Sequence, residues 1–195
     1  KQLEAQAYDP TILAKLKDIN LAENNKFFLW HTWFSDVFNR EDKEGFDIVI
    51  GNPPYIGEKG HKEIFQPVKA DIHLGQYYLG KMDYFYFFFH LAFNMLSPSG
   101  VATFITTNYY PTALGARKLR ADIKDRMNIK TLFNLGELRL FENAPGQHNM
   151  ISSFAKGKDG CKCQVIDVHK KGALNPIMFT SIINHIDEDT TYADI

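Results

Sequence analysis

A short apolar strand that stops at two prolines constrains the fold of this chain more than any other feature. Residues 46–57 read FDIVIGNPPYIG. Within it, Phe46, Ile48, Val49 and Ile50 form a short apolar run rich in β-branched side chains, which predicts a core strand. Gly51 ends the run, and Pro53 and Pro54 lack the N–H that further sheet pairing would need. The sequence therefore holds an amide and an aromatic side chain at the end of a strand.

The tetrad Asn52-Pro53-Pro54-Tyr55 is suited to activating a poorly nucleophilic amine, such as the exocyclic amine of adenine. Two acceptors aimed at its N–H bonds would localise the lone pair on nitrogen. The Asn52 side-chain oxygen is one acceptor, and the Pro53 carbonyl, restricted by both prolines, is the second. Preorganised acceptors of this kind are a large source of catalysis. Tyr55 offers a flat face for stacking a base. The plain alternative is that the tetrad is only a turn.

Helical and strand patterns alternate after this point, which predicts an α/β sheet flanked by helices. Segments around Leu132 and Ile151 are expected to pair as an antiparallel hairpin at one edge of the sheet. Ligands of open α/β sheets bind at the carboxyl ends of the strands, where Asn52 is placed. The expected elements are a loop with a short helix over 57–80, helices over 81–96, 113–127 and 176–186, and strands over 101–107, 129–136, 149–157 and 163–169.

Composition excludes several classes of protein. The net charge of −1 gives no global argument for nucleic-acid binding. The most apolar run, Tyr84 to Leu96, is shorter than the ~20 residues that span a bilayer, so no membrane association is expected. Cys161 and Cys163 are too few ligands for a structural zinc site. We therefore expect a cytoplasmic protein with reduced thiols and no bound metal.

Several blocks of the sequence resemble one known family. FDIVIGNPPY resembles the catalytic motif of S-adenosylmethionine-dependent adenine-N6 DNA methyltransferases. MDYFYFFFHLAFNMLSPSGVATFITTNYY is similar to the helix and strand that follow it in that family. IKTLFNLGELRLFENAPGQHNMISSFAKG resembles the segment whose phenylalanine, here Phe141, stacks on the target base. FFLWHTWFSDVF resembles the lead-in of large fused type II restriction-modification enzymes. The resemblance covers about residues 27–157.

The resemblance implies specific roles for the matching residues. Asn52 and Pro53 would hold the target amine, and Tyr55 and Phe141 would stack on the two faces of an adenine flipped out of double-stranded DNA. The fold would be the carboxyl-terminal half of a Rossmann-like methyltransferase sheet. The parent enzyme would use S-adenosylmethionine, but the glycine-rich cofactor turn is missing here. We therefore expect no cofactor in this chain and assign no cofactor contact beyond the region of Pro54.

Two further sets of candidates follow from their positions. Residues directly after the strand over 101–107 would line the crevice, and the basic face of the helix over 113–127 would contact DNA phosphates, although a solvated face is the usual explanation. Asp83 is interpreted as a cap of the aromatic helix. The candidates are Asn108, Tyr109 and Tyr110 for the crevice, and Arg117, Lys118 and Arg120 for the phosphates.

The expected organisation has three parts: a helical tail of an upstream region over 1–25, the catalytic half of a methyltransferase domain over 26–157, and a linker or the start of a target-recognition region over 158–195. We expect the parent to methylate adenine N6 in a restriction-modification or phage-defence system. The isolated chain should be inactive and prone to self-association, because half of the sheet is missing. Two alternatives are a protein glutamine-amide methyltransferase and a catalytically inactive DNA-binding module.

Overall fold

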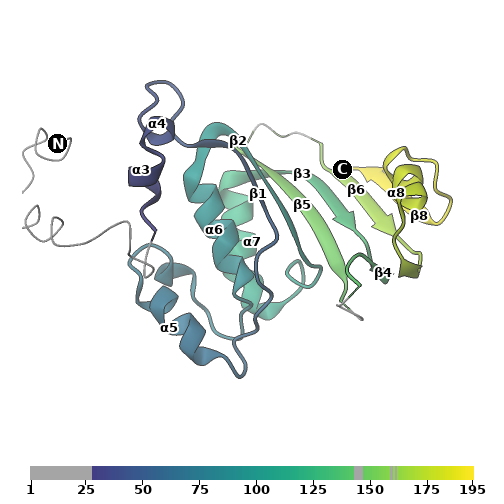
Figure 1. Cartoon of the computed structure of the whole chain (residues 1–195), viewed down its shortest axis with the longest axis horizontal. Coiled ribbons are helices and arrows are strands. Elements are labelled where there is room, and N and C mark those ends of the chain that lie inside the picture. Colours follow the sequence, from purple (N-terminus) through teal and green to yellow (C-terminus); the bar gives the residue numbers. More distant parts are fainter. Residues whose placement is uncertain (1–27, 143–146, 159, 161) are drawn as a thin grey trace, which may run out of the picture. The chain divides into compact units, whose positions relative to one another are not determined.

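The computed structural model describes residues 28–142, 147–158, 160 and 162–195 (Figure 1). The chain divides into two compact units, residues 1–37 and 38–195. In the first unit, α3 (Trp30–Trp33) and the start of α4 (Ser35–Phe38) belong to a dense aromatic segment in which the rings of Phe28 and Trp33 stack. The helix expected near the start of the chain lies outside the described residues, as does Cys161.

The second unit is built on a six-stranded mixed sheet with the strand order β1-β2-β5-β3-β6-β8 (Figure 1). Strands β1, β2, β3 and β6 run in one direction, and β5 and β8 run against them. The α/β fold predicted from the sequence is therefore confirmed. The elements are β1 (Phe46–Gly51), α5 (Lys62–Ala70), η1 (Gly75–Tyr77), α6 (Phe85–Met95), β2 (Leu96–Thr107), η2 (Leu114–Ala116), α7 (Arg117–Arg126), β3 (Met127–Asn134), β4 (Leu138–Arg139), β5 (Asn149–Lys156), β6 (Gln164–Val168), β7 (Gly172–Ala173), α8 (Pro176–Ile183) and β8 (Thr190–Asp194).

The antiparallel pair predicted around Leu132 and Ile151 forms, but its predicted position at the edge of the sheet is wrong. Strands β3 and β5 pair with Leu132 opposite Ser152 and Phe133 opposite Ile151. Strand β5 also pairs with β2, and β3 continues the sheet through β6 and β8. The pair therefore lies inside the sheet. Within the described residues the edges are β1 and β8, so the interpretation of β1 as a core strand also needs correction.

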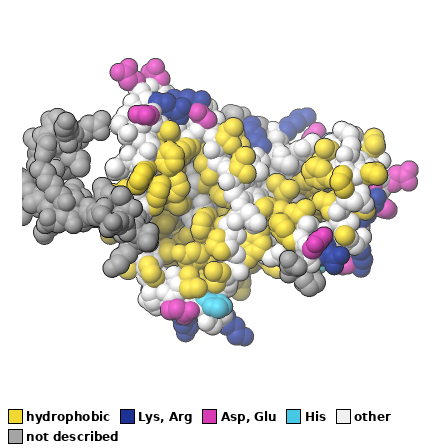
Figure 2. Space-filling view, in the orientation of Figure 1, with side chains coloured by type: hydrophobic (Ala, Val, Ile, Leu, Met, Phe, Trp, Pro, Cys, Tyr) yellow, Lys and Arg dark blue, Asp and Glu magenta, His cyan; other side chains and the backbone are white. Residues whose placement is uncertain are grey.

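The two faces of the sheet are covered unequally at the β1–β2 end. One face packs against α6 and α7 through buried side chains such as Ala102, Phe104 and Phe154. On the other face, Ile48 and Ile50 of β1 are 65% and 78% exposed. Hydrophobic side chains are visible over broad areas of the molecular surface in Figure 2. An apolar strand with one exposed face explains why β1 reads as buried in the sequence and is not buried among the described residues.

Helix α6 supplies a large part of the core, and its phenylalanines recur every four positions. Phe85, Phe89 and Phe93 lie along one side of the helix, and each is at most 1% exposed. Phe89 also stacks on Phe104 of β2, with ring centroids 4.7 Å apart. The helix is 11 residues long, and no helix in the described part of the chain is long and apolar enough to cross a membrane.

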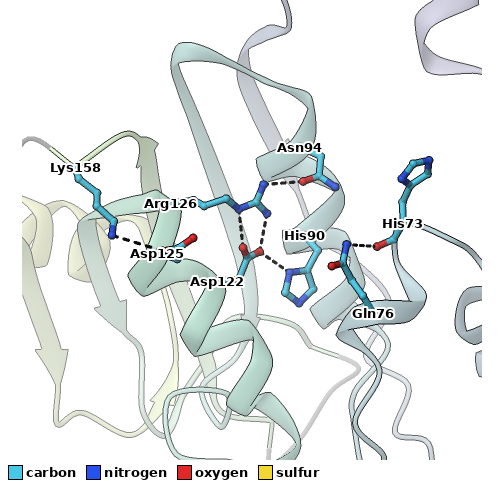
Figure 3. A network of polar contacts seen from close by, with 8 residues as sticks. All are labelled: His73, Gln76, His90, Asn94, Asp122, Asp125, Arg126 and Lys158. Carbon is cyan, nitrogen blue, oxygen red and sulfur yellow. Dashed lines mark hydrogen bonds and ion pairs between the residues drawn. The ribbon is translucent and has the colours of Figure 1, made fainter.

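A buried polar clamp joins α6 to α7 (Figure 3). His90 Nδ1 lies 2.6 Å from Asp122 Oδ2, and Arg126 donates to both Asp122 oxygens at 2.6 and 2.7 Å. Arg126 also donates to Asn94, and the Tyr77 ring stacks on the His90 ring. Burial would raise the pKa of Asp122, but His90 and Arg126 together lower it. The carboxylate therefore stays ionised, and both of its oxygens are hydrogen-bonded to partners on the two helices.

The clamp contains a neutral histidine. Burial lowers the pKa of His90, although its bond to Asp122 opposes that shift. Its Nε2 is buried with no hydrogen-bond partner in the described structure. A charged imidazole would need a second acceptor there, so the stable form is neutral, with Nδ1–H donating to Asp122.

Helix α8 packs at the opposite end of the sheet from β1. Its buried Ile182 belongs to a second apolar cluster with Phe133 of β3 and Ile166 of β6. Residues 164–194 thus form part of the same sheet as the predicted catalytic half. The assignment of residues 158–195 to a linker or target-recognition region stays a prediction.

Candidate active site

The tetrad 52–55 follows directly after β1, at the carboxyl end of the strand. Pro53 is buried, whereas Asn52 is exposed. The Tyr55 hydroxyl lies 2.7 Å from Asn52 Oδ1 and 2.9 Å from the Ile105 carbonyl oxygen of β2. Its single proton serves these two acceptors. Tyr55 thus ties the Asn52 amide to the carboxyl end of the neighbouring strand.

The surroundings of Tyr55 keep its hydroxyl protonated. Burial raises the pKa of Tyr55 to about 12, while a hydrogen bond from the Asn149 side chain works against that shift. The ring packs edge-on against Phe85, with centroids 5.9 Å apart. At neutral pH the hydroxyl is therefore a donor shared by Asn52 and the Ile105 carbonyl, and these contacts and Phe85 hold the ring in place.

Asp83 fastens the loop that follows the tetrad to the start of α6. Its Oδ1 accepts from the Ile56 N–H at 3.1 Å and from the Phe85 N–H at 3.4 Å. The Tyr84 N–H in turn donates to the Ile56 carbonyl at 2.8 Å. Burial raises the pKa of Asp83, and these backbone N–H groups partly offset the rise. Besides its contact at the helix start, Asp83 therefore positions the tetrad loop.

The residues after β2 have different environments. Asn108 donates to the Asn134 side chain at 2.9 Å, and Asn134 donates to Asp167 at 2.7 Å, which gives a row of polar groups across the ends of β2, β3 and β6. Tyr109 is 54% exposed beside these groups. Tyr110 is only 3% exposed and bonds Ser152 at 2.7 Å. Its predicted place in the crevice is therefore corrected: Tyr110 is a core residue.

Two of the three residues predicted to contact DNA phosphates donate hydrogen bonds to backbone carbonyls of the protein. Lys118 donates to the Tyr78 carbonyl at 2.8 Å and also to the Gln76 carbonyl, and Arg120 donates to the carbonyls of Tyr110 and Ala113. These charged groups hold loops in place. Arg117 is exposed at the start of α7.

Phe141 is half-buried and lies two residues after β4. Its role in stacking on a base stays a prediction.

Asn149 is a member of the site that sequence reasoning missed. It is 1% exposed, begins β5 and lies beside Tyr55. Strand β5 runs antiparallel between β2 and β3. Its first residue therefore lies at the same end of the strands as the last residues of β2. The sequence signal was a polar residue at the start of a strand, which is informative only when the strand direction is known.

Comparison with known families decides the relationship of this chain. The model of the family described as Eco57I restriction-modification methylase matches residues 1–141. This chain belongs to that family. The match includes β1, the tetrad and the α6–β2 block. It therefore confirms that those blocks of sequence resemble restriction-modification methylases.

Individual methylases are more distant. The type II methyltransferase M.HincII of Haemophilus influenzae is 25% identical over 141 residues, which are 72% of this chain and 28% of that protein. The chain thus spans 28% of the length of this curated relative. A type I restriction-modification methyltransferase subunit from Streptococcus thermophilus has a TM-score of 0.55 at 16% identity, over 80% of this chain and 35% of the other.

One similar solved structure includes nucleic acid. It is a nuclease-deletion mutant of the Type ISP restriction-modification enzyme LlaGI in complex with a DNA substrate mimic. Its TM-score is 0.53 at 18% identity, over 78% of this chain and 17% of that one. At these identities the two structural matches show that the fold of the methylase family is shared.

Proposed function

We propose that the whole protein to which these residues belong is a restriction-modification DNA methyltransferase that methylates the N6 amine of adenine. The observation that carries this proposal is the position of the Asn52 amide. It is held by Tyr55 at the carboxyl end of β1, in a chain of the Eco57I methylase family. An exposed and oriented amide oxygen at that point is what amine activation requires.

In this proposal, Asn52 Oδ1 and the Pro53 carbonyl accept the two N–H bonds of the target amine. Both acceptors favour a tetrahedral nitrogen, because they draw the N–H bonds out of the plane of the ring. The lone pair then points away from the ring toward an electrophile, and the positive charge that develops on nitrogen lies beside two fixed dipoles. Asn52 Oδ1 can accept the amine while it accepts from Tyr55, because an amide oxygen has two lone pairs.

The base must leave the DNA stack to reach this loop, so the proposal includes base flipping. Tyr55 and Phe141 are the aromatic residues proposed to stack on the two faces of the flipped adenine. Replacing Phe141 by Ala should lower the fluorescence signal of a 2-aminopurine placed at the target position, whereas Phe141→Trp should retain most of it. Equal signals from Phe141→Ala and the unmutated protein would contradict the stacking role.

S-adenosylmethionine is the methyl donor proposed for the whole protein, and when bound it supplies an electrophilic methyl group. The residues described here do not fit it by themselves. No G-x-G turn follows an apolar strand in the sequence, and Pro54 is exposed beside the open edge of β1. We therefore propose that residues 1–195 alone do not transfer methyl groups.

Double-stranded DNA is the proposed substrate. Support comes from the restriction-modification family of this chain and from the DNA mimic bound in the LlaGI structure. The test is incubation of the whole protein with duplex DNA and methyl-labelled S-adenosylmethionine, followed by mass spectrometry of the nucleosides. We expect N6-methyldeoxyadenosine. Label in cytosine, or label in a protein glutamine amide with none in DNA, would contradict the proposal.

A further inference from the structure

A lysine-rich cavity opens directly beside the tetrad loop. It has a volume of about 800 Å³, and α5 and the segments on either side of it form its walls. Phe65 and Met82 are buried at its base. The lower end of the molecule around α5 carries basic side chains, along with acidic ones and a histidine, in Figure 2. Four exposed lysines line the cavity: Lys59, Lys62, Lys69 and Lys81.

The protein balances only part of the positive charge of this cavity. Glu58 is the one carboxylate among the lining residues, and Tyr78 donates a hydrogen bond to it. That bond lowers the pKa of Glu58, with help from the backbone N–H groups of Lys81 and Met82. The charge of Lys62 also helps to lower the pKa of Glu58, and Lys69 Nζ lies 4.9 Å from the centre of the Tyr78 ring. Within the described residues, none of the four lysines forms an ion pair. Four like charges around one hollow repel one another, and an anion placed there relieves that repulsion.

The cavity wall and the tetrad loop are one continuous structure. The Glu58 N–H donates to the Met82 carbonyl at 2.9 Å, and Gly57 bridges to Asp83, the residue that fastens the tetrad loop. Glu58 is three positions after Tyr55, so the Cα atoms of the two residues are at most ~11 Å apart. An anion in the cavity would therefore lie within one or two nucleotides of a base held at the tetrad.

The backbone that carries Lys81 is held in an uncommon conformation. Gly80 and Lys81 both have positive φ angles, of 88° and 53°. The segment packs against Gly115 so closely that a Cβ on that glycine would lie 2.1 Å from the Lys81 carbonyl oxygen. A left-handed conformation is rare for a residue with a side chain, and it persists where the surroundings determine it. The position of Lys81 at the cavity is thus fixed by the fold.

We propose that this cavity binds phosphodiester groups of the DNA strand that carries the target base. The inference rests on the proposed function and adds the part of the surface that holds the DNA backbone. The lysines of the cavity take the role predicted for the basic face of α7, where Lys118 and Arg120 are occupied by backbone carbonyls. Ammonium groups on flexible stems suit phosphate oxygens, which need charge more than a fixed geometry.

The test compares two double variants of the whole protein that lose the same charge. Lys62→Gln/Lys69→Gln removes two lysines that lie two turns apart on α5. Lys124→Gln/Lys162→Gln removes two exposed lysines at the opposite, amino-terminal edge of the parallel strands. DNA affinity is measured as a function of salt concentration. Loss of two phosphate contacts should reduce the slope of log K against log salt by ~1.8 in the cavity variant. The control variant should keep the slope of the unmutated protein.

Methyl transfer separates a failure of this inference from a failure of the proposed function. The cavity variant should reach a normal rate at saturating DNA, with a raised KM for DNA. Equal salt slopes and equal KM values in the two double variants would overturn the cavity site and leave the proposed function standing. Absence of DNA methylation by the unmutated protein would overturn the proposed function instead.

Neutral DNA linkages locate the contact. Methylphosphonates on either side of the target adenine should weaken binding to the unmutated protein and to the control variant. They should weaken binding to the cavity variant much less, because the partners of those phosphates are already removed. Fully additive losses would show that the lysines contact other phosphates or none, and would overturn the inference.

Discussion

The polar clusters around Asp122 and Asn52 are both built from side-chain hydrogen bonds, but they serve different purposes. Asp122 is buried, and both of its oxygens are taken by His90 and Arg126, so the carboxylate has little capacity left for a ligand. Asn52 is exposed, and its amide oxygen accepts from Tyr55 alone among the described side chains. The first cluster joins two helices. The second holds an acceptor in place and leaves one lone pair open, which is the condition for acting on a substrate.

Removing the carboxylate of the clamp should have the largest effect on stability. Asp122→Ala leaves the Arg126 guanidinium without its partner between α6 and α7. We expect a loss of ~3 kcal/mol in the free energy of unfolding, at the low end for a broken buried pair because Arg126 reaches solvent. Equilibrium urea unfolding measures it.

The matched control is Asp125→Ala on the same helix (Figure 3). Asp125 is 80% exposed and lies 3.8 Å from Lys158, so its loss should cost at most ~1 kcal/mol. Similar losses in the two variants would remove the distinction between a buried clamp and a surface pair.

The substitution Tyr55→Phe tests the second cluster, in which the Tyr55 hydroxyl holds Asn52, and a smaller effect is expected. The ring and its packing on Phe85 remain, but Asn52 and the Ile105 carbonyl lose their donor. The lost bond is worth ~0.5–1.5 kcal/mol, so methyl transfer should slow by up to about tenfold. Single-turnover kinetics of the whole protein would show it. A loss of ~10²–10³-fold, which is the size expected when a preorganised acceptor is removed, would mean that the hydroxyl contacts the substrate itself.

The smallest expected effect is a pH dependence of the free energy of unfolding, which arises from His90 in the clamp. Burial lowers the pKa of His90 below its usual 6.5, so the unfolded chain binds this proton more readily than the folded one. Stability should therefore fall as the pH drops below about 6.5. The groups that face His90 are Asp122, Arg126, Lys118 and Tyr77. Of these, Asp122 titrates only at lower pH, because its own pKa is lowered.

His90→Asn keeps a donor for Asp122 and removes the titrating ring. Urea unfolding at pH 8 and pH 5 should show a smaller difference in the variant than in the unmutated protein. An unchanged difference would assign the pH dependence to other residues.

Local patterns explain why part of the fold was predictable. The strand at 46–51 is encoded by neighbouring residues, as is the aromatic helix α6, and both elements are confirmed, although β1 lies at an edge of the sheet. The pairing of β3 with β5 was also predictable, because only a short segment with the two-residue strand β4 separates the two strands in the chain. Its place inside the sheet was not, because it depends on β6, which pairs with β3 through contacts that no local pattern specifies.

Side-chain direction and distant partners explain the rest. Tyr110 follows a strand as a crevice residue would, but its ring turns into the core against Phe89. Lys118 looks like part of a solvated basic face, yet its acceptors come from a loop 40 residues earlier in the sequence. The four lysines of the cavity are scattered over residues 59–81, which the sequence predicts as a loop with a short helix and the start of the next helix. They become one feature once Asp83 and Gly115 fix that segment in space.

The function of the tetrad can be decided with Asn52→Ala in the whole protein. Single-turnover methyl transfer to duplex DNA and the DNA dissociation constant are measured on the same preparation, with urea unfolding as the control for folding. Loss of one preorganised acceptor should slow methyl transfer by ~10²–10³-fold. DNA affinity and stability should stay close to those of the unmutated protein, because Asn52 is exposed and is proposed to contact the amine rather than the phosphates. A rate within a few-fold of the unmutated protein would contradict the assignment of Asn52 to the reacting amine.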